Sequence, residues 1–100
     1  MGRRRGFDKG KISRIVSVLY SHQDGVWIRQ IARETSMHHN TVTKYVDTVM
    51  KPLVEDVSLG RQSKPMLRVI RLKPLVVQKL QEGRSLDQIL RLLEIIKENE

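Results

Sequence analysis

The chain has 100 residues and no cysteine, so it has room for one small domain, or one domain plus an extra helix, and it holds no disulfide or thiolate metal site. Its 19 Lys and Arg residues outnumber its 11 Asp and Glu residues, and the resulting net charge of +8 favours a polyanionic partner, nucleic acid ahead of an anionic membrane surface. No apolar run approaches the roughly 20 residues of a membrane span, and no apolar segment follows the basic N-terminus as in a secretory signal, so we expect no membrane partner and a cytoplasmic protein. Because its charge favours nucleic acid, we expect it to be nucleoid-associated.

The positive charge lies in the first four-fifths of the chain, whereas residues 81–100 are weakly acidic. Residues 1–10 form a basic arm in which Arg3, Arg4 and Arg5 stand between two glycines. We expect this arm to be flexible and to lie along DNA phosphates or enter a minor groove. We expect the weakly acidic residues 81–100 to have a role other than binding a polyanion.

Apolar residues three, four and seven positions apart predict an amphipathic helix over residues 9–21. The β-prone pair at residues 26–27 follows a turn, and we expect Trp27 to be buried. Ile28 and Ile31 then begin a second, short helix that ends near residues 35–37.

A third helix is predicted over residues 39–51, again from apolar residues at helical spacing. We expect Tyr45 on its apolar side to be semi-buried with its hydroxyl at the surface. Pro52 should end this helix, because proline lacks an N–H and disfavours helical backbone in the residue before it.

Two β-prone runs, residues 53–59 and 66–72, flank the polar sequence GRQSKP and predict a β-hairpin with a long loop over residues 60–65. Pro74 suits the first position of a fourth helix, and Gly83 suits its end.

Ser85 can cap a fifth helix, which is amphipathic. Its apolar stripe includes Leu86, Ile89, Leu90, Leu93 and Ile96.

The stretch IRQIARETSMHHNTVTKYVDTVM, residues 28–50, joins two short helices by a tight turn, and the small Ala32 lets the second helix cross closely. The stretch resembles the winged helix-turn-helix family of DNA-binding domains, especially small bacterial and archaeal regulators. Residues 31–34 and 41–46 carry the resemblance in the two helices, and Met37 carries it in the turn.

The sequence GRQSKP falls where this family has its wing, and the resemblance covers about residues 11–73. It implies a mainly helical fold with a small β-hairpin: a winged helix-turn-helix domain over residues 11–83, followed by a C-terminal dimerisation helix over residues 84–100.

The chain departs from the family pattern at three positions. Ser36 stands where glycine is frequent, Thr35 where leucine is common, and His38 where Ser, Thr or Asp usually caps the recognition helix. That helix therefore begins either directly after His38 or later, with Asn40 as its cap.

The resemblance implies that the recognition helix and the wing contact DNA. The expected contacts are His38, His39, Asn40, Thr41, Thr43 and Lys44 on the helix, and Arg61, Gln62, Ser63 and Lys64 on the wing. Asn can bind adenine, Thr a thymine methyl group, and Lys a phosphate or guanine. Asp47 would repel phosphates, so it either accepts a hydrogen bond from cytosine or lies off the interface.

The last helix must pack on something, because a single helix of about 15 residues is marginal alone in water. It could pack back onto its own domain. We favour pairing with a second copy through Leu86, Ile89, Leu90, Leu93 and Ile96. Winged regulators often dimerise through terminal helices, and a two-fold symmetric dimer can bind two DNA half-sites at once.

A metal site at His38 and His39 is disfavoured. Adjacent residues at a helix start point about 100° apart, and no cluster of carboxylates completes a ligand set. We also find no carboxylate pair, nucleophile–base set or phosphate-binding Gly loop, so we expect no enzyme, no metal and no cofactor.

The predicted function is that of a dimeric transcriptional regulator that binds double-stranded DNA. One alternative is a non-specific architectural, chromatin-like protein. Another is a winged helix that serves protein–protein assembly, which the basic helix and wing disfavour. The ratio of the affinity for a specific DNA site to the affinity for random-sequence DNA distinguishes the regulator from the architectural protein.

Overall fold

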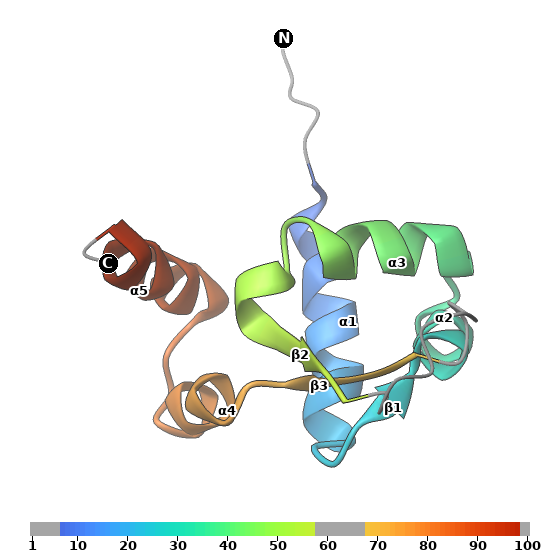
Figure 1. The fold of residues 1–100 in the computed structure, drawn as a ribbon, viewed down its shortest axis with the longest axis horizontal. Helices are drawn as coiled ribbons and strands as arrows, with labels where there is room; N and C mark the ends of the chain where they lie inside the picture. The colour runs from blue at the N-terminus through green and yellow to red at the C-terminus, as the bar shows by residue number, and fades with distance from the viewer. Residues whose placement is uncertain (1–6, 58–67, 99–100) are drawn as a thin grey trace, which may run out of the picture.

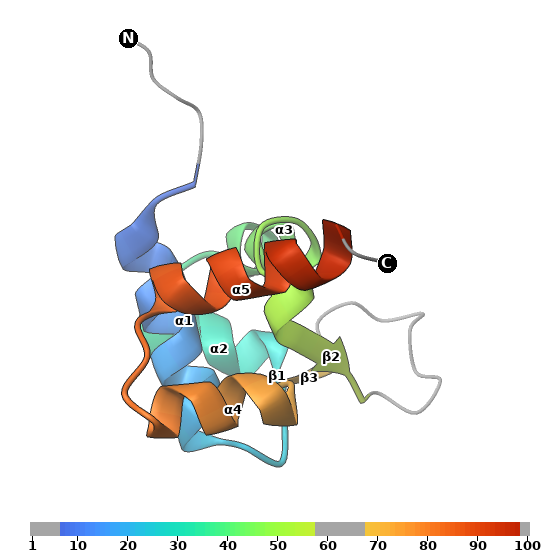
Figure 2. The same ribbon diagram turned by 90° about the vertical axis from the view of Figure 1, so that its left-hand side faces the viewer.

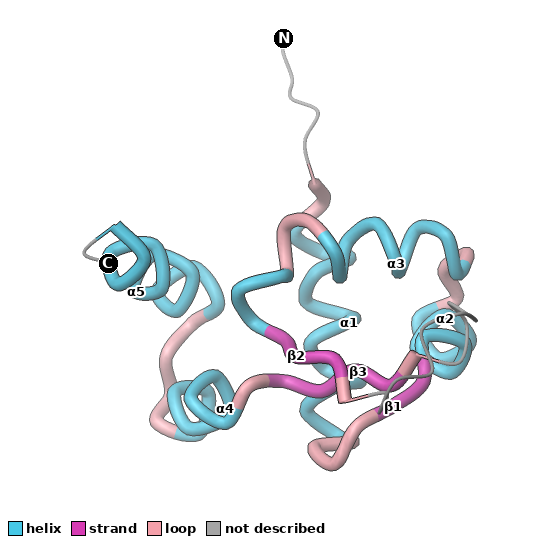
Figure 3. Tube along the Cα trace, viewed as in Figure 1, coloured by secondary structure: helices cyan, strands magenta, loops and turns pink. Residues whose placement is uncertain are grey.

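The computed structural model describes residues 7–57 and 68–98, with the side chains of the last helix described as far as Leu92. The chain is mainly helical and has a small three-stranded antiparallel sheet (Figures 1 and 3). Its elements are α1 Lys9–Ser21, β1 Val26–Trp27, α2 Ile28–Thr35, α3 His39–Asp47, the 3-10 turn η1 Lys51–Leu53, β2 Val54–Asp56, β3 Val69–Leu72, α4 Pro74–Gln81 and α5 Leu86–Glu98. Within the described ranges, no helix has the length and apolar character needed to span a membrane.

The start of α1 is fixed by Phe7 and Asp8, two residues of the predicted basic arm. The backbone N–H of Gly10 donates to the Asp8 Oδ1 at 2.7 Å, so Asp8 caps the helix. The Asp8 N–H donates to the Tyr45 hydroxyl at 3.0 Å, and the Phe7 ring packs edge-on against Tyr45 with centroids 5.0 Å apart. Residues 7–10 therefore belong to the folded domain, and the predicted arm over residues 1–10 is too long.

The end of α2 is a left-handed turn at Ser36, with φ 59° and ψ 36°. The N–H of Met37 donates to the Ala32 carbonyl at 3.0 Å, and the N–H of Ser36 donates to the Arg33 carbonyl, as in a Schellman motif. Thr35 is buried, and its hydroxyl donates to the Ile31 carbonyl at 2.7 Å. A threonine is thus accommodated where the family often has leucine, because its polar group is satisfied within the helix.

Helix α3, the predicted recognition helix, begins directly after His38 and ends earlier than predicted. The Asn40 N–H donates to the His38 Nδ1 at 3.1 Å, so His38 is the cap. The helix stops at Asp47, so the prediction of a helix to residue 51 is wrong. The Thr48 hydroxyl donates to the Lys44 carbonyl, and the Thr48 backbone, with φ −121° and ψ −89°, has already left the helical conformation.

The sheet has the order β1-β3-β2, with every neighbouring pair antiparallel. Val54 lies opposite Leu72, which confirms the strands of the predicted hairpin, and the loop over residues 60–65 lies outside the described residues. The pairing of β1 with β3, with Val26 opposite Ile70, adds the third strand.

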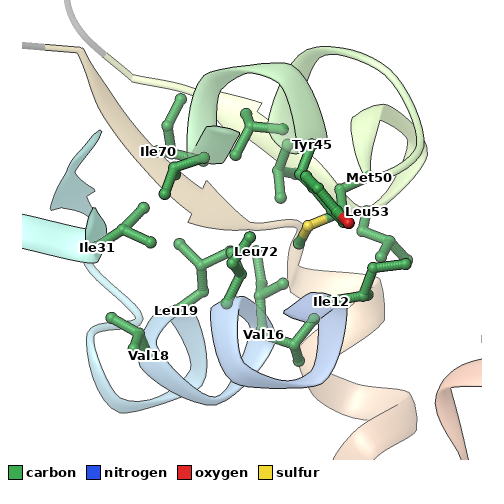
Figure 4. Packing of buried hydrophobic residues seen from close by; sticks show 14 of the residues in the cluster. Ile12, Val16, Val18, Leu19, Ile31, Tyr45, Met50, Leu53, Ile70 and Leu72 are labelled. Atoms are coloured by element: carbon green, nitrogen blue, oxygen red, sulfur yellow. The ribbon is translucent and has the colours of Figure 1, made fainter. Parts of the chain in front are cut away.

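Side chains of α1, α2, α3 and β3 meet in one apolar core (Figure 4). Trp27 is not part of it: this side chain is 49% exposed, so the prediction of a buried tryptophan is wrong. Successive strand residues point to opposite faces, and the neighbouring Val26 takes the inward position. Tyr45 is only 7% exposed, and its hydroxyl accepts from Asp8 rather than lying free at the surface.

The last two helices lie on the same side of the domain (Figure 2). Gly83, with φ 89°, ends α4, and Ser85 and Gln88 form a capping box at α5: the Gln88 N–H donates to Ser85 Oγ at 3.2 Å, and the Ser85 N–H donates to Gln88 Oε1 at 3.0 Å. The end of α4 near Gly83 and the start of α5 after Ser85 therefore confirm the predictions made from these two residues.

The fifth helix packs back onto its own domain through Ile89. This side chain is 2% exposed and belongs to the same core as α1 and β3, while Leu86 and Leu90 pack against that core partly buried. Ile89 is thus buried within its own chain, as in the alternative that the helix packs back on its own domain, and it offers almost no exposed surface to a second copy. The side chains of Leu93 and Ile96 lie outside the described part of the chain.

Candidate nucleic-acid interface

One face of α3 is directed away from the core. Val42 and Val46 are buried, whereas Asn40, Lys44 and Asp47 are exposed. The exposed residues are four and three positions apart, so they form one stripe along the helix. Three further predicted contacts, His39, Thr41 and Thr43, are half-buried beside it.

A shallow hollow of about 380 Å³ lies between α2 and the start of α3. Its floor is apolar, from Ala32 and Met37. Its cationic and titratable lining comes from Arg29, Arg33, His38 and His39. The structure thus brings the two predicted histidines together with two arginines that the sequence analysis did not select.

The two arginines could have been found from their spacing. Arg29 and Arg33 are four residues apart, so they lie one above the other on α2. Ile28 and Ile31 on the same helix are buried, which leaves both arginines on its exposed side.

His38 and His39 stack, with ring centroids 4.4 Å apart and an angle of 28° between the planes. The expectation that adjacent side chains diverge is therefore wrong for these two rings. The His38 Nδ1 accepts the capping hydrogen bond from Asn40, so this atom is not free for a metal. Over residues 7–57 and 68–92, no three His, Cys, Asp or Glu side chains gather in a position to hold a metal ion.

Arg29, Arg33 and Lys44 form no ion pair with any described residue. Glu34 is the one acidic residue of α2. Its Oε2 accepts from Gln30 Nε2 at 2.7 Å and lies 3.4 Å from His22 Nε2. We refer to Arg29, Arg33, His38, His39, Asn40 and Lys44 together as the α2–α3 surface.

Asp47 is neutralised by Arg68, the residue that directly precedes β3. Its two carboxylate oxygens accept from the two terminal nitrogens of Arg68, each at 2.9 Å. The Arg68 Nε also donates to Asp56 Oδ2 at 2.9 Å. The hydrogen bonds to Asp47 and Asp56 raise the pKa of Arg68, although partial burial opposes this. Of the two roles considered for Asp47, the paired carboxylate favours a position off the interface.

The other predicted contacts belong to the wing and to the arm. Arg61, Gln62, Ser63 and Lys64 of the wing, and Arg3, Arg4 and Arg5 of the arm, lie outside the described residues. The chain is described on both sides of the wing, at Val57 and at Arg68.

Comparisons with family models, with curated proteins and with solved structures found no match for this chain.

Proposed function

We propose that the protein binds double-stranded DNA as a winged helix-turn-helix transcriptional regulator, with α3 in the major groove. The observation that carries the proposal is the α2–α3 surface: three exposed cations without described ion pairs stand beside a helix whose one outward carboxylate is neutralised. A major groove about 12 Å wide admits one α-helix, and its floor presents distinct donors and acceptors.

The residues of this surface have different roles in the proposal. Asn40 on the exposed stripe binds a base edge, and its amide can pair with adenine through two hydrogen bonds. Lys44, one turn further along, binds a guanine or a phosphate. Arg29 and Arg33 bind phosphates, which fix the position of the protein without selecting a sequence.

The segments outside the described residues keep the roles that the sequence predicts. Arg61 and Lys64 of the wing, with Arg3, Arg4 and Arg5 of the arm, bind phosphates or a minor groove. Their charge adds to that of the α2–α3 surface and increases the salt dependence of binding.

A homodimer remains part of the proposal, with a changed contact surface. Ile89 is excluded from it, because this side chain is buried in its own chain. Leu86 and Leu90 line a groove of about 360 Å³ together with Phe7, Ile12 and Val49. A second copy that covers this groove would bury the apolar walls and use the sequence-predicted Leu93 and Ile96.

The test is selection of bound duplexes from a random pool, followed by titration of the selected duplex and a random one at 50–200 mM salt. If each protomer makes about 5–8 phosphate contacts, the plot of log K against log salt should have a slope of roughly −5 to −7. A flat salt response would contradict the electrostatic basis of the proposal. Equal affinity for the two duplexes would favour the non-specific architectural alternative.

Substitutions locate the interface. Asn40→Ala and Lys44→Ala should each cost roughly 1–3 kcal/mol on the selected duplex and little on the random one. The double variant Arg29→Ala/Arg33→Ala should weaken binding to both duplexes alike.

The matched control removes the same charge elsewhere. Arg84 and Arg91 are exposed near and on α5 and form no ion pair with the described residues. Their double alanine variant should bind both duplexes nearly as well as the unaltered protein. If it weakens binding as much as the α2 pair does, DNA does not bind at the α2–α3 surface.

A further inference from the structure

Arg68 lies where the helix-turn-helix meets the hairpin, and it contacts three elements. Its side chain donates to Asp47, the last residue of α3, and to Asp56, the last residue of β2, at 2.9 Å in each case. Its own carbonyl accepts from the N–H of Ile28, the first residue of α2, at 3.1 Å. One residue beside β3 thus joins both helices of the motif to the paired strand.

The geometry of this contact differs from that of an ordinary surface ion pair. The Arg68 side chain is only 17% exposed, whereas that of Lys9 in its ion pair with Asp87 is 80% exposed. The planar guanidinium uses two nitrogens for Asp47 and a third for Asp56, so the relative orientation of the two carboxylates is fixed. A lysine carries the same charge, but it lacks the planar fork of donors with which the guanidinium holds both carboxylates.

The position of Arg68 along the chain gives the contact a consequence for binding. Asp56 is the last residue of β2 and Arg68 directly precedes β3, so their ion pair and that of Arg68 with Asp47 hold the ends of both strands against the C-terminal end of α3. If α3 and the wing contact DNA together, the relative placement of these two segments must match the spacing of the grooves.

We propose that Arg68 is a positioning residue that fixes the ends of β2 and β3 against α3, so that the recognition helix and the hairpin engage one DNA site as a rigid unit. The proposal rests on the proposed function for its DNA part. Its structural part, the fixing of the strand ends, stands on the hydrogen bonds alone.

Electrostatics and positioning predict different effects on the two affinities when Asp47 is changed. Asp47→Asn removes a negative charge next to the interface, so electrostatics alone predicts tighter binding to every duplex. Loss of positioning predicts instead that the preference for the selected duplex over the random one falls. Arg68→Lys keeps the charge and loses the fork, so it should lower the same preference without changing the net charge.

The first measurement needs no DNA and uses amide hydrogen exchange of the full chain. The N–H of Val57 donates to the Val69 carbonyl at 2.8 Å at the end of the strand pair beside Arg68, and the N–H of Lys73 donates to the Leu53 carbonyl at 2.9 Å at the opposite end. In both variants, exchange at Val57 should increase by at least about threefold relative to Lys73. A general loss of stability would accelerate both amides together, and equal acceleration, or none, would overturn the proposal.

The second measurement is the ratio of affinities for the selected and random duplexes. We expect Asp47→Asn and Arg68→Lys each to lower this ratio by at least about threefold. The double variant should lower it by about as much as Arg68→Lys alone, because Arg68→Lys already breaks the contact with Asp47. If exchange at Val57 increases while the ratio stays unchanged, Arg68 fixes the strands without any role in DNA binding, and the positioning proposal is wrong. If the unaltered protein binds no DNA, the proposed function fails, and with it this role, while the exchange measurement still shows whether Arg68 fixes the strand ends.

Discussion

Replacing Ile89 with alanine should destabilise the protein by about 2–5 kcal/mol, the range for truncating a large aliphatic side chain in a packed core. The side chain is 2% exposed and lies in the core that α1 and β3 also form, so its loss removes apolar burial and leaves a cavity. A small domain has about 5–15 kcal/mol of total stability, so the effect should be a large fraction of it.

The assay is urea denaturation followed by far-UV circular dichroism at protein concentrations a hundredfold apart, with sedimentation to report the oligomeric state. If Ile89 stabilises its own chain, the loss of free energy of unfolding should be the same at both concentrations. If Ile89 instead stabilised a dimer contact, the loss should disappear where the unaltered protein is monomeric.

Arg91→Ala supplies the control on the same helix, because Arg91 is exposed and should change stability by no more than about 0.5 kcal/mol. An Ile89→Ala variant as stable as the unaltered monomer would refute the assignment of α5 to the core. The outcome of sedimentation does not affect this reasoning, because a dimer through Leu86 and Leu90 is compatible with a buried Ile89.

Substitutions at three positions test local features of the backbone, each in the same urea titration. Ser36→Gly should stabilise by about 0.5–1 kcal/mol, because glycine adopts the left-handed φ of 59° without the cost of a Cβ atom, and an unchanged or lower stability would contradict strain at this turn. Gly25→Ala should destabilise by at least about 1 kcal/mol, because φ is 123° and a Cβ atom would lie 2.7 Å from the Val69 Cγ1; a tolerated alanine would mean that the turn adopts another conformation. His38→Ala should cost about 1 kcal/mol by removing the cap of α3, whereas His38→Asp should retain the cap, and equal stability of the two variants would rule out capping by this side chain.

Much of the secondary structure could be predicted because its signals are local. The spacing of apolar residues located α1, and Pro74 and Gly83 marked the two ends of α4, since each acts on its own φ angle and hydrogen bonds. Ser85 marked the start of α5 by the same kind of local capping. These features depend on neighbours within one or two helical turns, which the sequence alone contains.

The basic candidate surface could be predicted only in part. His38, Asn40 and Lys44 followed from the resemblance of the motif, and the exposure of Asn40 and Lys44 agrees with a face directed away from the core. Arg29 and Arg33 were overlooked, although their spacing on an amphipathic helix was sufficient to find them. Whether this face binds DNA stays a prediction.

The tertiary structure decided the features that depend on residues far apart in the chain. Arg68 reaches Asp47, 21 residues away, and Asp56, 12 residues away, and no local pattern indicates that these three charges meet. The burial of Ile89 and the exposure of Trp27 also do not follow from the local sequence. An apolar stripe on a helix does not show which surface it packs against, and a pair of β-prone residues does not show which side chain faces the core. Burial is a property of the space between elements, so the fate of each of these side chains is determined only when the elements pack together.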